Sequence, residues 1–184
     1  MRTRRAGQAA RSGVSSVCQR RQELLLQRAR ISNRRGFEHL AERELTRARR
    51  VGCATTLVMI DVDGFKALND SHGHADGDKA LVAIADVLGS GRATDLAGRL
   101  GGDEFVVLLP ETDSASARVV VERLQARLTD AVRSAGFPVT FSIGVATFPR
   151  AARLGDMLRE ADALMYRTKR CGKDGATYGE LETP

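Results

Sequence analysis

The chain has 184 residues, 42% of them hydrophobic, which is enough for one domain with a substantial core. No apolar run approaches the length that crosses a bilayer. The three cysteines, an odd number without framework spacing, argue against a disulfide scaffold. We therefore expect a cytoplasmic globular protein with reduced thiols.

The net charge of +6 is unevenly distributed. Residues 1–50 contain 14 Arg and 4 Glu, so they carry +10, whereas residues 51–184 carry −4. Residues 1–32 are predicted to be a basic arm, disordered to partly helical, and a helix is predicted over 38–50. Arginine-rich arms can bind nucleic acid or anionic membranes, but no aromatic residue precedes Phe37 to stack on bases, so neither partner has a strong case.

An apolar strand is predicted over residues 55–61, and it ends abruptly in acids, the last of them Asp61. The Asp-Gly turn at 63–64 opens a short helix that runs through Asn69. The first N–H groups of a helix attract anions, and Lys66 adds a full positive charge in that first turn. A phosphate could bind there, although an exposed surface lysine would give the same pattern.

The next predicted elements are a helix over residues 79–88 and a hairpin over 99–109. Gly101 and Gly102 can take the positive φ that a tight turn needs. The run 105–109 is apolar and favours a β-strand. The hairpin therefore carries its acids at the tip.

Asp103 and Glu104 are these tip acids. Acids beside a Gly-Gly turn are often only solvated. If the strand that ends at Asp61 is a neighbour of this hairpin, however, three carboxylates converge. Two like charges 4 Å apart repel by about 4 kcal/mol at an effective dielectric constant near 20, so such a cluster must protonate or bind a cation. Hard oxygen donors favour Mg²⁺ or Mn²⁺ over zinc.

The remaining pattern predicts a helix over residues 114–133, a strand over 137–147 and a helix over 155–170. Gly144 within that strand predicts a close backbone approach. Together the elements indicate an α+β fold, with a mostly antiparallel central sheet of about five strands flanked by helices. Residues 179–184 are expected to be a C-terminal tail.

Two motifs stand at the centre of the chain: Gly101-Gly-Asp-Glu-Phe105 and, upstream of it, Asp61-Val-Asp-Gly-Phe-Lys-Ala-Leu-Asn-Asp-Ser-His-Gly-His-Ala-Asp-Gly-Asp78. Together they resemble the motifs of the GGDEF family of diguanylate cyclases. The resemblance covers residues 33–178 and marks them as the catalytic domain, with a palm-like nucleotidyl-cyclase fold. It implies that two GTP molecules are condensed into cyclic di-GMP and that pyrophosphate is released.

The resemblance also implies residue roles. It implies two Mg²⁺ or Mn²⁺ ions per active site, held by Asp61, the carbonyl of Val62, Asp103 and Glu104. Asp103 is the expected proton acceptor, with Glu104 as the alternative. The substrate-binding residues that it implies are Phe65, Lys66, Asn69, His74, Asp78, Gly101, Gly102, Lys169 and Lys173.

The resemblance assigns guanine recognition to Asn69 and Asp78, with His74 nearby. The pairing edge of guanine presents one acceptor, O6, beside two donors, N1–H and the N2 amino group. An Asp accepts from both donors, and an Asn can donate to O6, whereas adenine would present the wrong pattern. A helix-capping Asp and a turn Asn are the alternatives at these positions.

Five residues separate Asp95 of Arg92-Ala-Thr-Asp95 from Gly101, which resembles the spacing of the family's inhibitory product site. Arg123 is the third candidate for this site, or else a solvated helix residue. The resemblance therefore implies product inhibition by cyclic di-GMP. Because one site holds one GTP, it also implies a catalytic homodimer.

Two departures from the family pattern keep an alternative open. Residues 26–32 lack the Asp-x-Leu-Thr-Gly-Leu type of opening motif, which couples the cyclase to an upstream sensory or regulatory partner. Lys173 stands where the family places an Arg, so the forked geometry for phosphate is lost. The alternative is a weak or inactive GGDEF domain that acts as a receptor for cyclic di-GMP or GTP.

Overall fold

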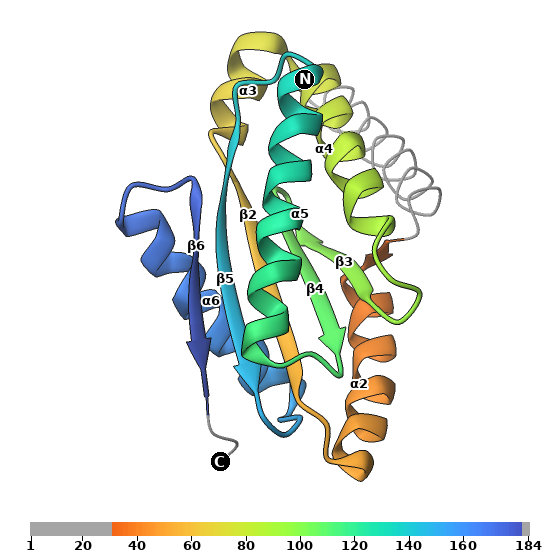
Figure 1. The fold of residues 1–184 in the computed structure, drawn as a ribbon. Coiled ribbons are helices and arrows are strands. Elements are labelled where there is room, and N and C mark those ends of the chain that lie inside the picture. Colours follow the sequence, from red (N-terminus) through yellow and green to blue (C-terminus); the bar gives the residue numbers. More distant parts are fainter. Residues whose placement is uncertain (1–30, 182–184) are drawn as a thin grey trace, which may run out of the picture.

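A computed structural model describes residues 31–181 as a six-stranded sheet with helices on both faces (Figure 1). Residues 1–30 and 182–184, which hold most of the predicted arm and half of the predicted tail, lie outside the described residues. The strands are β1 (Ser32–Asn33), β2 (Thr55–Asp63), β3 (Leu96–Gly101), β4 (Glu104–Pro110), β5 (Thr140–Phe148) and β6 (Gly175–Glu180). The helices are α2 (Arg34–Val51), α3 (Phe65–His72), α4 (His74–Gly89), α5 (Ser114–Ser134) and α6 (Leu154–Arg170).

The strand order is β1-β3-β4-β2-β5-β6. The three inner pairings are antiparallel, whereas β1 runs parallel to β3 and β6 runs parallel to β5. The predicted α+β class is confirmed, but the sheet is mixed and has six strands rather than being mostly antiparallel with about five. The sequence does not indicate the two edge strands, because β1 has only two residues and β6 is a half-buried strand without an apolar run.

The sheet extends slightly beyond the limits of 33–178 expected from the resemblance. β6 reaches Glu180, and the N–H of Leu181 donates to the carbonyl of Thr147 at 2.9 Å. At the other end, Ile31 is 4% exposed and packs into the core. Within residues 31–181, no helix has both the length and the apolar character needed to cross a bilayer.

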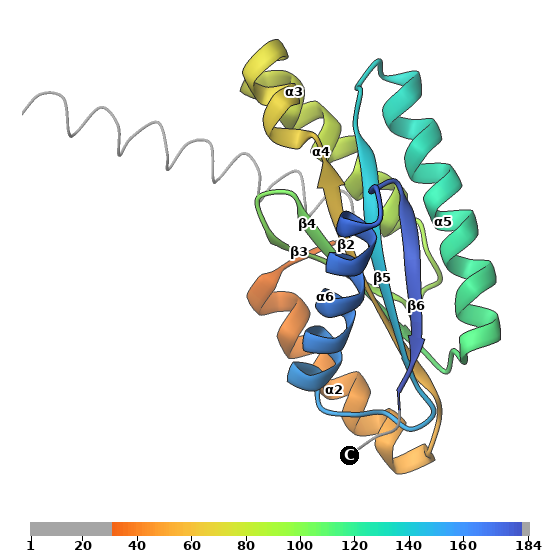
Figure 2. The ribbon, with the colours of Figure 1, turned by 90° about the vertical axis from the view of Figure 1, so that its left-hand side faces the viewer.

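Alternating side chains of the central strands enter two cores, one on each face of the sheet. On β2, Ile60 and Val62 pack toward α4 and α5, whereas Met59 packs toward α2 and α6. Figure 2 shows α5 on one side of the sheet and α2 and α6 on the other. By the same alternation, Asp61 and Asp63 share the face of Met59, so both acids belong to the α2–α6 face.

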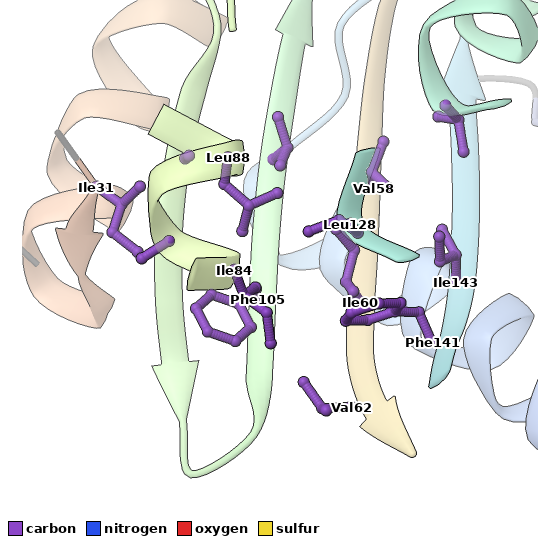
Figure 3. Packing of buried hydrophobic residues seen from close by; sticks show 14 of the residues in the cluster. Ile31, Val58, Ile60, Val62, Ile84, Leu88, Phe105, Leu128, Phe141 and Ile143 are labelled. Atoms are coloured by element: carbon purple, nitrogen blue, oxygen red, sulfur yellow. The ribbon is translucent and has the colours of Figure 1, made fainter. Parts of the chain in front are cut away.

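The core under α4 and α5 is built from aliphatic residues and two phenylalanines. Ile84 and Leu88 of α4 and Leu128 of α5 pack over Phe105 and Phe141 of the sheet (Figure 3). Each side chain is at most 5% exposed. Because full burial of such a side chain contributes about 1.5–3 kcal/mol, this core anchors both helices firmly to the strands that carry the acids.

Gly144 lets α6 lie directly on the sheet. A Cβ at this position would collide with the carbonyl oxygen of Ala161 and the backbone nitrogen of Met165. The close backbone approach predicted at Gly144 is therefore confirmed. The hydroxyl of Thr168 donates to the carbonyl of Ile143 at 2.9 Å and fixes the last turn of α6 on β5.

Candidate active site

The β3–β4 hairpin carries Asp103 and Glu104 at its turn, and both are half-buried. The N–H of Val62 donates to the carbonyl of Asp103 at 3.2 Å, so β2 and the turn lie side by side. Arg99 fixes the turn from its own strand, because its Nε and Nη2 donate to the carbonyl of Gly102 at 3.1 and 2.6 Å. Sequence reasoning missed Arg99, although a basic residue two positions before a Gly-Gly turn was a usable signal.

Asp61 and Glu104 are direct partners in the antiparallel register of β2 and β4. Directly opposed side chains lie about 5 Å apart at Cβ, and like charges there are unfavourable. Lys169 of α6 counters this repulsion, because its Nζ lies 2.7 Å from Oδ2 of Asp61. The structure thus brings Asp61, Asp103 and Glu104 to one end of the sheet, with a cation of the chain against them.

Burial is the main cause that raises the pKa of Asp61, which is 8% exposed, and the hydrogen bond from Lys169 opposes that rise. Burial alone would lower the pKa of Lys169, but Asp61, Asp103 and Glu104 together raise it above its ordinary value. Lys169 therefore stays protonated, and the negative charges of all three acids favour its charged form. The cluster is electrostatically coupled rather than a set of separate solvated side chains.

The acids offer hard oxygen donors that fit a divalent cation. An extended residue directs its N–H and C=O to the same neighbouring strand, so the carbonyl of Val62 faces the hairpin as its N–H does. Within residues 31–181, no group of three or more His, Cys, Asp or Glu side chains is assembled tightly enough to hold a metal by itself. A cation bound there would take its remaining ligands from phosphate and water.

Gly77 lets the side chain of Asn69 of α3 lie against α4, one residue before Asp78. A Cβ on Gly77 would collide with Oδ1 of Asn69 and lie 3.0 Å from its Cγ. The glycine therefore leaves room for the Asn69 amide beside the turn of α4 that carries Asp78, which is half-buried. Sequence reasoning missed Gly77 because the predicted helix started only at residue 79, whereas α4 already begins at His74.

The predicted capping alternative for Asp78 does not hold. The N-cap residue of α4 is Gly73, and no side chain of residues 31–181 caps it. Asp76, in the first turn of α4, pairs with Lys79 at 2.8 Å, and this hydrogen bond lowers the pKa of Asp76. His74 is exposed in the first turn of α4.

Further cations stand at the same end of the molecule. Lys66 is exposed in the first turn of α3, beside the half-buried Phe65, and Lys173 is exposed in the connection between α6 and β6. Figure 2 shows α3, the β3–β4 turn and the α6–β6 connection at one end of the sheet. Gly101 and Gly102 are both exposed at this turn, so backbone is accessible there. The arrangement combines acids, cations and open backbone, as a triphosphate site with a divalent cation requires.

The three residues expected at the product site line a single pocket of about 300 Å³ between α4, α5 and the sheet. The N–H of Arg92 donates to Oδ2 of Asp95 at 2.9 Å. Burial raises the pKa of Asp95, and Arg92 opposes the rise. Arg123 projects from α5 into the same lining, and Arg127 of α5 donates to Oγ of Ser90 at 2.5 Å. The lining of the pocket combines charged residues with aliphatic ones.

Comparison with known proteins places these features in a family. The model of the family described as "Diguanylate cyclase, GGDEF domain" matches residues 27–175. The chain belongs to the GGDEF family. The match covers most of the chain and includes every site residue named above, so the GGDEF domain occupies nearly the whole structure.

Curated relatives resemble this GGDEF domain over most of its length. Diguanylate cyclase DgcP from Pseudomonas aeruginosa is 36% identical over 148 residues, which are 78% of this chain and 22% of the relative. Probable diguanylate cyclase DgcC from Escherichia coli is 35% identical over 149 residues, 78% of this chain and 40% of the relative. The chain thus spans less than half the length of either relative.

Solved structures share the GGDEF architecture. The GGDEF domain of DgcB from Caulobacter crescentus, in complex with c-di-GMP, matches with a TM-score of 0.71 at 25% identity and covers 80% of this chain and 88% of that one. Diguanylate cyclase SiaD from Pseudomonas aeruginosa, solved with its activator SiaC, matches with a TM-score of 0.70 at 36% identity and covers 93% of this chain and 70% of that one.

Proposed function

We propose that this GGDEF domain is a diguanylate cyclase, which condenses two GTP molecules into cyclic di-GMP and releases pyrophosphate. The observation that carries the proposal is the cluster at the end of β2 and β4, where Asp61 faces Glu104 and Lys169 contacts Asp61. Family membership and the diguanylate cyclase relatives support the same activity.

Guanine is bound through Asn69 and Asp78. The Asp78 carboxylate accepts from N1–H and the N2 amino group, and the Asn69 amide donates to O6. The space that Gly77 leaves beside the Asn69 amide supports this assignment. Adenine would face Asp78 with an acceptor and lose these contacts, so GTP is the substrate rather than ATP.

Asp61, the Val62 carbonyl, Asp103 and Glu104 would hold the divalent cations, Mg²⁺ or Mn²⁺, two per site. Such cations neutralise the triphosphate and lower the pKa of the attacking 3′-hydroxyl. Lys169 binds the terminal phosphates by exchanging its contact with Asp61 for a phosphate oxygen, and Asp103 accepts the proton of the hydroxyl. The half-burial of Asp103 and its place at the turn support this role.

The remaining cations hold the phosphates in place. Lys66 stands at the start of α3, where the backbone N–H groups also attract an anion. Lys173 offers a point charge to the terminal phosphate. Both residues are exposed at the end of the sheet that carries the acids, which supports the assignment.

The reaction needs two chains. The 3′-hydroxyl of one GTP attacks the α-phosphate of the other, pyrophosphate leaves, and the reciprocal attack closes the ring. One domain supplies one guanine site, so the two sites face each other in a homodimer. An upstream sensory or regulatory partner would control this encounter, as the structure of SiaD with its activator SiaC illustrates for that protein.

Cyclic di-GMP inhibits the enzyme by binding Arg92, Asp95 and Arg123. An Arg can grip a guanine edge or a phosphate, and the Asp accepts from guanine donors. The common pocket of these three residues supports this proposal. The same pocket favours a second candidate function, a receptor that binds cyclic di-GMP without turnover, because it is formed independently of the acids at the hairpin.

The deciding experiment incubates the purified chain with GTP and Mg²⁺, after bound nucleotide has been stripped, and separates the products by chromatography. The Asp103→Ala variant is the matched control. We expect cyclic di-GMP and pyrophosphate from the wild type and neither from the variant. Tight binding of cyclic di-GMP without product from either chain would favour the receptor.

A further inference from the structure

Asp63, the second acid at the end of β2, is engaged within the protein. It is 7% exposed and shares the α2–α6 face with Asp61. Its carboxylate accepts hydrogen bonds from the hydroxyl of Ser142, at 2.9 and 3.0 Å to the two oxygens, and from the hydroxyl of Thr140 at 3.2 Å. Both donors belong to β5, whereas Asp61 contacts Lys169 of α6. The two acids of β2 therefore have different partners.

A further donor links Asp63 to the connection between α6 and β6. The N–H of Asp174 donates to Oδ2 of Asp63 at 3.3 Å. In this connection, Gly172, Lys173 and Asp174 have φ values of 113°, 65° and 45°. Residues other than glycine persist in the left-handed region only where the surrounding structure enforces it, and such residues gather at functional sites. The hydrogen bond from Asp174 to Asp63 is one of the contacts that keep these residues in this conformation.

The backbone of Lys173 is held on both sides. Its own N–H donates to the carbonyl of Thr168 at 3.1 Å, and the next N–H, of Asp174, donates to Asp63. Gly175 then starts β6 by pairing with Ser142, whose hydroxyl also donates to Asp63. The exposed side chain of Lys173 therefore projects from a backbone that is already ordered, which reduces the entropy cost of engaging a phosphate.

We propose that Asp63 is a positioning residue: it holds the backbone of Lys173 in the place from which the lysine side chain binds the terminal phosphates of GTP. The inference rests on the phosphate-binding role proposed above for Lys173. Asp63 touches neither nucleotide nor cation in this scheme and acts only through the connection that it ties to β5. Its loss should therefore weaken binding of the triphosphate and spare binding of guanosine monophosphate.

The test compares the affinities of 3′-deoxy-GTP, which lacks the attacking hydroxyl, and of GMP for the full chain in the presence of Mg²⁺, by titration calorimetry. Asp63→Asn keeps the shape but weakens the acceptor. We expect it to lower affinity for 3′-deoxy-GTP about three- to tenfold and to leave affinity for GMP within about twofold. Asp130→Asn, at an exposed acid of α5, is the control for the lost charge and should change neither affinity.

A double-mutant cycle with Lys173→Ala separates positioning from general damage. If Asp63 acts through Lys173, then Asp63→Asn adds no further loss in the Lys173→Ala background. Ser142→Ala is the second route, because it removes two contacts to Asp63 without altering the acid, and it should show the same selective loss. It keeps the inference testable if Asp63→Asn does not fold.

The outcomes are distinguishable. Equal loss of both nucleotides, or additive losses in the double variant, would overturn the positioning role of Asp63 alone. Unchanged affinity for 3′-deoxy-GTP in Lys173→Ala would overturn the proposed role of Lys173, and the role of Asp63 with it.

Discussion

Gly77→Ala is expected to separate stability from substrate binding. The substitution places a methyl group on the buried face of α4, where it would collide with Oδ1 of Asn69. The colliding atom is the end of a side chain rather than backbone, so Asn69 can turn away. Alanine is also more favourable than glycine inside a helix by about 0.8–1.0 kcal/mol.

The expected result is therefore a domain as stable as the wild type, or more stable by up to about 1 kcal/mol, that binds GTP less well. The turned amide no longer donates to O6 of guanine. A neutral hydrogen bond contributes about 0.5–1.5 kcal/mol, which corresponds to about a two- to tenfold rise in the dissociation constant for GTP. Urea unfolding measures the first quantity, and titration with 3′-deoxy-GTP measures the second.

Two controls make the test specific. Gly155→Ala replaces another helical glycine, whose Cβ would meet no atom within 4 Å, so it should raise stability slightly and leave GTP affinity unchanged. In an Asn69→Ala background the methyl of Gly77→Ala has room, so no further loss of affinity should follow. A destabilised Gly77→Ala domain with wild-type affinity for GTP would refute the reasoning, because backbone and not Asn69 would then have moved.

Three other predictions follow from the sheet and its acids. Burial raises the pKa of Asp61, so the folded chain holds the proton of this carboxyl group more tightly than the unfolded chain does. Protonation of Asp61 therefore stabilises the fold, and this contribution is lost as pH rises through the pKa of Asp61 in the folded chain. Asp61→Asn should thus raise the melting temperature near pH 7 in EDTA, with the difference disappearing below about pH 4; an equal gain at every pH would contradict this. Gly144→Ala forces a methyl into the backbone of α6 and should destabilise the domain by about 1–3 kcal/mol or more in urea unfolding, whereas a neutral effect would mean that α6 is not seated on β5. Arg99→Lys keeps the charge but cannot reproduce both contacts to Gly102, so the rate of cyclic di-GMP formation should fall with little change in melting temperature, and full activity would exclude a role of Arg99 in the turn.

Much of the molecule was predictable because its signals are local. Apolar runs beside acids indicated β2 and the β3–β4 hairpin. β2 ends two residues after the predicted strand, and the hairpin starts three residues before and ends one residue after the predicted range. The glycine in β5 indicated a close backbone approach, and the structure identifies α6 as the element that approaches. Turn chemistry, strand length and helical periodicity each depend on neighbours in sequence, so they can be interpreted from the chain alone. Most candidate site residues, by contrast, came from the resemblance of these motifs to the GGDEF family.

Only the tertiary structure decides which side chains that lie far apart in the sequence contact each other. The sequence contains two acids at the end of β2, and nothing in it distinguishes their partners. The packing of α6 places Lys169 beside Asp61, and the register with β5 places Ser142 beside Asp63. The edge strands β1 and β6 likewise depend on pairing rather than on their own composition. Hydrogen bonds and ion pairs are short-range contacts between groups far apart along the chain, so their partners are settled when the sheet and helices pack.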